Sequence, residues 1–593
     1  MKPADRILCR RPQPVSEDPL PAELHPVLRR IYRARQVGAA AELDCTLERL
    51  LPPTLLLGMD RAVALLDQAL RQQRRILIVA DFDADGATSC AVVVRALTQM
   101  GAKDVRYLVP NRFEYGYGLT PEIVALAAQQ NPDLIITVDN GISSVAGVRA
   151  ARAHGMQVLI TDHHLPGAEL PEADAIVNPN QPGDAFPSKH LAGVGVAFYL
   201  MLALRAHLRA SGWFADRTEA RAAEQGSSGG GFAQQDITEP NLALLLDLVA
   251  LGTVADVVPL DANNRILVAQ GLARLNAGVG SPGVRALLAV AKRLPGRITA
   301  MDLGFVAGPR LNAAGRLADM SLGIACLLTD DAAAAQQMAR ELDTLNRERR
   351  GIEAGMQNQA LAALENLKLD AAGLPRGLCL YDESWHQGVI GLVAARIKER
   401  VHRPVIAFAR ANEHELKGSA RSVAGLHIRD ALDSIAARHP GLLSKFGGHA
   451  MAAGLTLARE RFDAFAQAFD AEVSRWLTDD DLQGRLYTDG ELAVEDFSLS
   501  LAETLRAGGP WGQGFPEPLF DGCFDVLERR IVGEKHLKLT LRTGSSKPIG
   551  AIAFHAAATP SDWTRIRAAY RLDVNEYQGN RSLQLVLEHL ESA

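Results

Sequence analysis

The sequence is most informative at Ile76-Leu77-Ile78-Val79-Ala80-Asp81-Phe82-Asp83-Ala84-Asp85-Gly86, where three carboxylates at alternate positions follow an apolar run. The run predicts a buried strand. Three like charges so close together repel one another unless a cation neutralises them, and a cluster of oxygen ligands favours Mg²⁺ or Mn²⁺. The alternative is a polar loop in which Asp85 or Ser89 caps a helix that begins near Ala87. The stretch therefore predicts a strand, a turn and a helix, with either a cation site or a helix cap between them.

Alternation of strand and helix patterns continues beyond this stretch. β-rich runs lie at 105–109, 134–138 and 158–161, and helical patterns lie at 87–100, 121–130 and 145–154. This order predicts a parallel sheet wrapped by helices.

Polar residues follow two further strands of the predicted sheet. Asp139 comes directly after the run 134–138, and Asp162-His163-His164 comes directly after the run 158–161. Because the carboxyl ends of parallel strands meet at one edge of a sheet, we expect these side chains to lie near the aspartates of the first motif. Asp256, at the end of the helical run 244–255, is a further candidate.

Such a set of carboxylates and a histidine suits a pair of divalent ions. Paired ions activate a nucleophilic water and stabilise the leaving oxygen of an in-line phosphoryl displacement. The reaction class that we expect is therefore hydrolysis of a phosphodiester or a phosphoanhydride. The chain has no Gly-x-x-x-x-Gly-Lys-Ser/Thr loop, so chemistry driven by nucleoside triphosphates has no support.

Composition sets broad limits on the protein. The chain has 593 residues, which at about 150 residues per domain predicts three or four domains. Its net charge of −6 gives no global reason to bind an acidic polymer, so a nucleic-acid site needs local basic patches or metal ions. Six scattered cysteines without a Cys-x-x-Cys pair argue against a disulfide framework and a zinc finger. Met1–Pro14 lacks the apolar run of a signal peptide, and Asp247 and Asp256 interrupt the most apolar stretch. We therefore expect a soluble, cytoplasmic protein.

The remaining patterns divide the chain further. Helical spacing of apolar residues extends over 42–70, and a long run of good helix formers extends over 330–367. A second region of strands and helices follows from Gly377, and β-like segments after Tyr487 predict a small barrel. The Gly/Ser-rich segment 224–235, near Ser227, is expected to be a surface insertion. We assign no function to this insertion or to the N-terminal lead.

The motifs in their order are similar to those of the DHH phosphoesterase family. The matching sequences are Asp-x-Asp-x-Asp-Gly, Val-Asp-Asn-Gly, Asp-His-His and Ala-Asp-Val-Val-Pro. Outside these motifs, the resemblance extends from about Arg74 to the C-terminus and includes the segments 110–118, 308–316, 447–454 and 509–515. Within the family, the chain looks like the exonucleases that digest single-stranded DNA from the 5′ end to mononucleotides by a two-metal mechanism. The resemblance implies a single-strand-binding protein and a helicase as partners in DNA repair and recombination, no membrane association, and a monomer.

The resemblance also implies a division into domains. The fold class is α/β, with a parallel-sheet DHH domain joined by a long helix to a smaller α/β DHH-associated domain, plus a C-terminal β-barrel of the OB-fold type. The expected boundaries are 1–70 for an N-terminal helical lead, 71–330 for the DHH catalytic domain, 331–372 for the connecting helix, 373–480 for the DHH-associated substrate-binding domain, and 481–593 for the OB-fold.

By this resemblance, particular residues take particular roles at the catalytic centre. Asp139 would bridge two ions, either Mg²⁺ or Mn²⁺. His164 would lie beside the reacting phosphate, and Asp81 would be a further ligand or would orient a ligand. The implied metal ligands are Asp83, Asp85, Asp139, His163 and Asp256.

Substrate contacts are implied in the same way. The loop Gly447-Gly448-His449 would close over the strand, its glycines letting backbone N–H groups approach a phosphate. The terminal 5′-phosphate would be bound by Arg112, Ser419 and Arg421, because an arginine fork suits a phosphate. Arg310 and Arg316 are candidates for steering the strand.

The barrel offers a basic region and nearby aromatic residues for binding a single strand. The basic region comprises Arg529, Arg530, Lys535, His536, Lys538, Arg542 and Lys547. Possible stacking faces, some of which must belong to the core, are Trp511, Phe515, Phe520 and Phe524.

Two other functions remain open from the sequence. One is a DHH phosphodiesterase that acts on short oligonucleotides or cyclic dinucleotides, against which the additional barrel argues. The other is a non-catalytic single-strand-binding protein, against which the complete set of acidic and histidine positions argues.

Overall fold

The structure is a computed structural model. It describes residues 6–14, 20–110, 118–214, 237–366, 374–448, 450–557, 559–560, 563–577 and 580–593. Arg112, His449 and the Gly/Ser-rich insertion near Ser227 lie outside these residues. Over the described ranges, none of the helices has both the length and the apolarity needed to span a bilayer.

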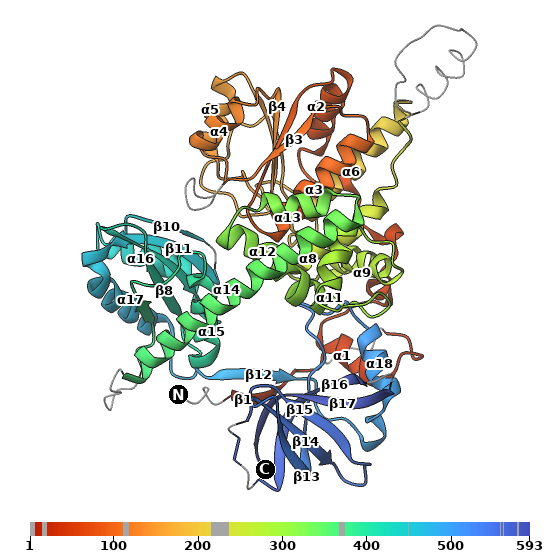
Figure 1. Ribbon diagram of the computed structural model, residues 1–593, viewed down its shortest axis with the longest axis vertical. Helices are drawn as coiled ribbons and strands as arrows, with labels where there is room; N and C mark the ends of the chain where they lie inside the picture. Colours follow the sequence, from red (N-terminus) through yellow and green to blue (C-terminus); the bar gives the residue numbers. More distant parts are fainter. Residues whose placement is uncertain are drawn as a thin grey trace.

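The first domain is built on a parallel sheet of five strands in the order β3-β2-β4-β5-β6 (Figure 1). The strands are β2 (Ile76–Ala80), β3 (Val105–Leu108), β4 (Leu134–Val138), β5 (Gln157–Thr161) and β6 (Ala175–Val177). All residues of β2 and β4 are buried, because helices cover both faces of the sheet. One face packs on α2 (Met59–Arg71), α3 (Ala84–Gln99) and α6 (Gly193–Ala210), and the other on α4 (Pro121–Ala128) and α5 (Val145–Ala153). The predicted parallel sheet is confirmed.

A helical layer lies beyond the carboxyl ends of the strands. It contains η4 (Leu242–Leu245), α8 (Leu246–Ala255), α9 (Ala262–Asn276), α10 (Pro282–Ala289), α11 (Ala300–Asp302), the π-helix η5 (Leu303–Ala307), α12 (Gly308–Leu317) and α13 (Ser321–Leu328). The long helix α14 (Ala332–Asn366) then leads away from this layer. Its 35 residues span about 50 Å and connect the first domain to the second, as the sequence predicts.

The second domain is a smaller α/β unit. Its sheet has the order β10-β11-β9-β8-β7, in which β7 and β8 are parallel and the other pairs are antiparallel. The strands are β7 (Leu378–Tyr381), β8 (Val405–Arg410), β9 (Glu415–Arg421), β10 (Lys445–Gly448) and β11 (Ala452–Ala458), and the helices are α15 (Ile390–Val401), α16 (Ile428–Arg438) and α17 (Phe462–Trp476).

The C-terminal region forms the predicted closed barrel. Its strands are β13 (Phe520–Val532), β14 (His536–Arg542), β15 (Ile549–Ala553), β16 (Arg565–Tyr577) and β17 (Asn580–Ser592), in the order β13-β14-β15-β17-β16. The four aromatic residues considered as stacking faces are all buried: Trp511, Phe515, Phe520 and Phe524. Each therefore packs in the core, and none presents a ring face to a nucleic acid.

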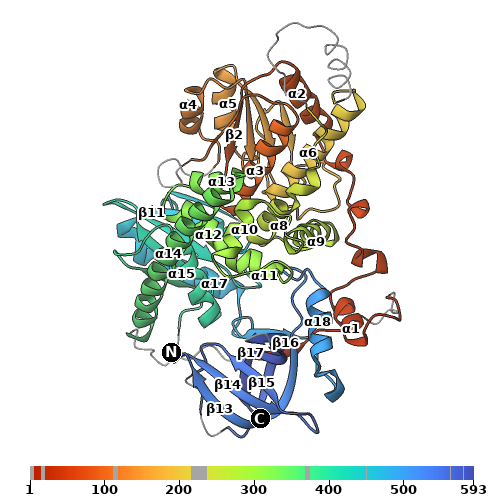
Figure 2. The ribbon, with the colours of Figure 1, turned by 45° about the vertical axis from the view of Figure 1, so that its right-hand side comes forward.

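The N-terminal lead connects the barrel to the first domain (Figures 1 and 2). Strand β1 (Arg6–Arg10) pairs in parallel with β12 (Gly484–Thr488), and α1 (Pro26–Ala34) stacks Tyr32 on Trp511 beside α18 (Leu499–Ala507). The expectation of one helical lead over 42–70 is wrong for its first part. Three short 3₁₀ turns, η1 (Ala40–Leu43), η2 (Leu47–Arg49) and η3 (Pro53–Leu55), precede α2. Pro52, Pro53 and the left-handed Gly58 interrupt the helical pattern there.

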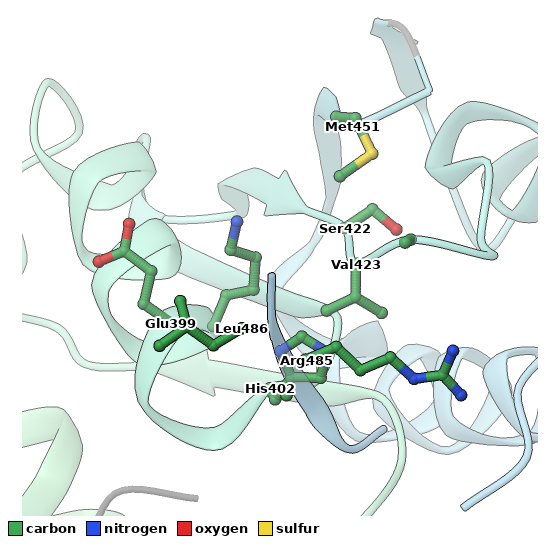
Figure 3. A pocket seen from close by; sticks show the side chains of 10 residues that line it. Glu399, His402, Ser422, Val423, Met451, Arg485 and Leu486 are labelled. Carbon is green, nitrogen blue, oxygen red and sulfur yellow. The ribbon is translucent and has the colours of Figure 1, made fainter. Parts of the chain in front are cut away.

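A cavity of about 240 Å³ lies where the second domain meets β12 (Figure 3). Its lining includes Glu399, His402, Met451 and Arg485, and the Glu399 and Arg485 side chains point apart. None of the candidate metal ligands lines this cavity, so it is separate from the candidate metal site at the sheet edge.

Candidate metal centre

The loop between β2 and α3 combines a helix cap with a cluster of carboxylates. Asp83 Oδ1 accepts hydrogen bonds from the backbone N–H groups of Asp85 and Gly86 at 2.9 and 3.1 Å, so Asp83 is the N-cap and the helix begins at Ala84. The alternative in which Asp85 or Ser89 caps a helix that starts near Ala87 is therefore wrong. Asp83 also belongs, with Asp81 and Asp139, to a group whose ligand atoms lie within 4.8 Å of one another.

Backbone N–H groups at the start of α6 hold the Asp85 side chain in place. Its two carboxylate oxygens accept hydrogen bonds from the N–H groups of Gly193 and Val194, at 2.7 and 2.9 Å, at the start of α6. Gly193 is needed there, because a Cβ atom would lie 2.7 Å from Asp139 Oδ1. The start of α6 thus orients one carboxylate and makes room for another.

His163 joins three carboxylates that come from separate elements. Its Nε2 atom lies 3.1 Å from Asp139 Oδ1, 3.4 Å from Asp256 Oδ2 and 4.0 Å from Asp85 Oδ2. Asp139 follows β4 in a left-handed conformation, with φ at 61°, and Asp256 is the C-cap of α8. The sheet edge therefore brings together the side chains that follow β2, β4 and β5, and α8 adds the fourth.

Asp162 organises the adjacent loop, a role that the sequence analysis missed. Its carboxylate is buried and accepts hydrogen bonds from the N–H groups of Ile142, His163 and His164, at 2.9, 2.7 and 3.0 Å. It also lies 2.7 Å from His164 Nδ1. An aspartate that directly follows a buried strand and precedes two N–H groups is the local signal for such a turn.

The carboxylate of Asp162 favours the protonated form of His164. Burial by itself lowers the pKa of the imidazole, but the hydrogen bond and charge of Asp162 outweigh burial and raise the pKa to about 9. Burial by itself raises the pKa of Asp162, and the contacts with His164 outweigh it and lower that pKa. The pair is therefore an imidazolium and a carboxylate at neutral pH.

The carboxylates of the centre repel one another. Burial first, and then the charge of Asp83, raises the pKa of Asp85 to about 7. Burial and the neighbouring aspartates raise the pKa values of Asp139 and Asp256 well above the ordinary range. Divalent cations would remove this repulsion. The donor set of carboxylate oxygens and imidazole nitrogen, arranged in three overlapping groups, fits Mg²⁺ or Mn²⁺.

Sequence comparisons match this architecture domain by domain. Residues 75–224 match the model of the DHH family, N-terminal domain, residues 375–475 match the DHHA1 domain, and residues 488–589 match the RecJ OB domain. Over 584 residues the chain is 55% identical to the single-stranded-DNA-specific exonuclease RecJ of Dickeya dadantii, with 98% of each chain covered. This chain belongs to the RecJ family.

Solved RecJ structures share the fold. Superposed on the crystal structure of RecJ in complex with Mn²⁺ from Thermus thermophilus, the chain has a TM-score of 0.77 at 31% identity, covering 96% of this chain and 76% of the other. The Mg²⁺ complex from the same organism gives a TM-score of 0.71 at 29% identity, covering 96% and 75%. Both structures support the α/β fold and the placement of the barrel.

Several candidate substrate contacts lie on the second domain. Ser419 and Arg421 point to the same side of β9, and the Arg421 guanidinium donates to Ser419 Oγ at 3.1 Å. Gly447 pairs with Gly454 on β11, which in turn pairs with Ser419 on β9. The glycine strand β10 therefore runs two strand spacings, about 10 Å, from Ser419.

Two arginines of the RecJ-like segment 308–316 have contacts within the protein. Arg310 is buried and ion-paired with Asp343 of α14 at 2.8 Å, and it also donates to the carbonyl of Val306. The guanidinium of Arg310 is thus engaged within the protein, and its role in steering the strand stays a prediction. Arg316 is partly exposed and donates to the carbonyl of Gly388 in the second domain at 3.2 Å.

Proposed function

We propose that this chain is a metal-dependent exonuclease that hydrolyses single-stranded DNA in the 5′→3′ direction to mononucleotides. The observation that carries the proposal is the buried centre in which His163 Nε2 lies within 4.0 Å of Asp85, Asp139 and Asp256. This centre occurs in a chain 55% identical, over nearly its whole length, to a single-stranded-DNA-specific exonuclease. We include Mg²⁺ or Mn²⁺ as its cofactor, and two ions as its working complement.

Each side chain of the centre has a defined task in this proposal. Asp83, Asp85, Asp139, His163 and Asp256 would hold the two ions, with Asp139 contributing to both, and Asp81 would orient a neighbouring ligand. When bound, such ions lower the pKa of a water and neutralise charge that develops on the phosphate. The amides of α6 keep Asp85 fixed, so its carboxylate needs no reorientation as the reaction proceeds.

His164 acts on the substrate itself. As an imidazolium held by Asp162, it donates a hydrogen bond from Nε2 to a non-bridging oxygen of the scissile phosphate. Charge that develops on that oxygen strengthens this hydrogen bond, so the interaction stabilises the transition state more than the bound substrate.

The second domain selects the end of the strand at which digestion begins. Ser419 and Arg421, already in contact with each other, bind the terminal 5′-phosphate together with Arg112, and Arg316 contacts the strand between the two domains. The backbone N–H groups of Gly447 and Gly448, with His449, close over the strand from β10. A site that binds a terminal phosphate admits a 5′-phosphorylated end and rejects a 3′-hydroxyl end.

The barrel holds the incoming strand. Its basic residues from Arg529 to Lys547 supply phosphate contacts, which are salt-dependent and independent of sequence. Phe554 is 55% exposed, and its ring packs edge-on against the imidazole of His536, with the two ring centroids 5.2 Å apart. This ring is the stacking face that we propose in place of the four buried aromatic residues.

We place this activity in DNA repair and recombination in the cytoplasm, with a helicase and a single-strand-binding protein supplying the substrate to a monomeric enzyme. The test compares the wild type with Asp139→Ala on a 5′-phosphorylated single strand, a blunt duplex and a dinucleotide, each with Mn²⁺. The proposal requires rapid digestion of the long single strand only, and only by the wild type. Preference for the dinucleotide, or tight strand binding without cleavage, would refute it.

A further inference from the structure

Helix α12 lies against the metal-binding loop. Asn312 Oδ1 accepts a hydrogen bond from the backbone N–H of Ala84 at 2.8 Å. Gly315 makes a closer contact, because a Cβ atom at this position would lie 1.8 Å from the carbonyl oxygen of Phe82. The helix therefore supports the two residues on either side of Asp83.

The hydrogen bond from Ala84 affects what the Asp83 carboxylate can do. Asp83 Oδ1 already accepts the next two N–H groups of α3, those of Asp85 and Gly86. Ala84 is buried, so its N–H group has little access to water. Without Asn312 it would compete for Asp83 and draw that carboxylate away from Asp81 and Asp139.

The C-terminal end of the same helix touches the second domain. Arg316 donates to the carbonyl of Gly388 at 3.2 Å, and a Cβ atom on Gly388 would lie 2.4 Å from the carbonyl oxygen of Arg316. Gly388 leads into α15, where Gly391 packs against both Ser419 and Arg421. A Cβ atom on Gly391 would lie 2.9 Å from Ser419 Oγ and 2.8 Å from Arg421 Nη2.

These contacts form one continuous path. It runs from the Ser419 and Arg421 side chains through the start of α15 to α12, and from α12 to the loop that carries Asp83. The buried ion pair between Arg310 and Asp343 ties α12 to α14, so α12 follows the helix that joins the two domains.

We propose that Asn312 is a positioning residue for the metal centre, and that α12 couples metal binding to occupation of the Ser419 and Arg421 site by a terminal phosphate. The second part rests on the proposed function. A phosphate that fixes the second domain against α12 restrains the loop at Asp83 and raises the affinity for the metal. By linkage, the metal raises the affinity for the phosphorylated end by the same factor.

The first test measures Mn²⁺ binding by titration calorimetry. Asn312→Leu keeps the branched shape and the number of heavy atoms of the side chain and removes the acceptor, and we expect the Kd for Mn²⁺ to rise about tenfold or more. Asn312→Asp keeps an acceptor oxygen and restores tight binding. Asn241→Leu is the matched control, because Asn241 caps η4 by accepting the N–H of Ala243, and η4 precedes the end of α8 that is opposite to Asp256. Mn²⁺ affinity in Asn312→Leu equal to that of the wild type overturns the positioning role.

The second test needs no change at Asn312 and covers the case in which Asn312→Leu does not fold. Mn²⁺ binding is measured with a short thymidine oligomer whose linkages are methylphosphonates, carrying either a 5′-phosphate or a 5′-hydroxyl. We expect the 5′-phosphate to lower the Kd for Mn²⁺ at least about fivefold in the wild type, and the 5′-hydroxyl to leave it unchanged. Gly388→Ala should abolish the difference, because the added methyl group separates α15 from α12.

The two failures can be told apart. A wild-type protein that digests phosphorylated single strands but binds Mn²⁺ equally well with both oligomers keeps the proposed function and overturns the coupling. A wild-type protein that digests no strand in Mn²⁺ refutes the proposed function, whatever Asn312→Leu does to metal affinity.

Discussion

Replacing Asp162 by asparagine should move the alkaline limit of the activity to lower pH. The asparagine side chain has nearly the same shape but no charge, so it removes the interaction that holds the pKa of His164 at about 9. The largest remaining influence is burial, which lowers the pKa, so His164 should titrate at or below its ordinary value of 6.5. In the proposed mechanism His164 acts as the imidazolium, so activity should be lost as pH rises through the pKa of His164.

The size of the effect follows from these two values. In a plot of kcat/KM against pH, the alkaline limb should move to lower pH by at least about 2.5, the difference between the pKa of about 9 for His164 in the wild type and its ordinary value of 6.5. Midway between the two limbs, the protonated fraction of His164, and with it kcat/KM, should fall roughly 20-fold.

The assay is the pH profile of kcat/KM on a phosphorylated single strand with Mn²⁺ at saturation. Asp174→Asn is the control, because Asp174 also accepts a backbone N–H from β5, that of Val158 at 2.8 Å, and lies away from His164. Thermal unfolding of each variant confirms that the fold is retained. An Asp162→Asn enzyme whose alkaline limb coincides with that of the wild type would refute the role assigned to the Asp162 and His164 pair.

Three further predictions concern stability, metal removal and strand binding. Arg35→Ala removes the guanidinium that lies 2.8 Å from the buried carboxylate of Asp489, and it should lower the free energy of unfolding by about 3–5 kcal/mol in urea titrations. A decrease in the free energy of unfolding of less than about 1 kcal/mol would contradict the role of this pair in fixing the N-terminal lead to the barrel. The fold raises the pKa of Asp85 to about 7, so below that pH the metal-free folded protein holds a proton that the unfolded chain releases. The unfolding temperature of the wild type should therefore be higher at pH 5.5 than at pH 8, by more than that of Asp85→Asn, and Mn²⁺ should remove this difference. Equal pH dependence of the unfolding temperature in both proteins would count against carboxylate repulsion at the centre. Phe554→Ala should weaken binding of a long single strand about fivefold or more in fluorescence anisotropy, whereas Leu294→Ala, which truncates another exposed apolar residue but one that lies on the first domain, should not; equal affinities would exclude Phe554 as a stacking face.

The chemistry of the centre was largely predictable because it depends on strand ends. In a parallel sheet, residues that directly follow neighbouring strands must meet at one edge, so Asp139 and His163 could be placed beside Asp85 from the sequence pattern. The helix cap was misplaced, because the pattern locates the start of a helix only within a few residues. The N-cap is Asp83, two residues before Asp85, which is the nearer of the two predicted caps. The Asp85 carboxylate therefore accepts hydrogen bonds from the backbone N–H groups of α6 instead.

What the sequence could not supply are contacts between residues far apart in the chain. Asn312 reaches Ala84 across 228 positions, and no local pattern indicates that pairing. Arg310 is a candidate for steering the strand, and the sequence pattern does not indicate its ion pair with Asp343. Trp511 looks available for stacking, yet Tyr32 from the N-terminal lead covers it. In each case the structure supplies a tertiary partner that the sequence pattern does not indicate.

The most direct test of the account follows the order in which label leaves a long single strand. One sample carries the label on its 5′-phosphate and the other on its 3′-terminal nucleotide, and each is digested with Mn²⁺ or Mg²⁺ and again with chelator. The account predicts that the 5′ label appears at once as a mononucleotide, that the 3′-labelled strand shortens progressively, and that chelator stops both. Release of the 3′ label first, or digestion that continues in chelator, would contradict it.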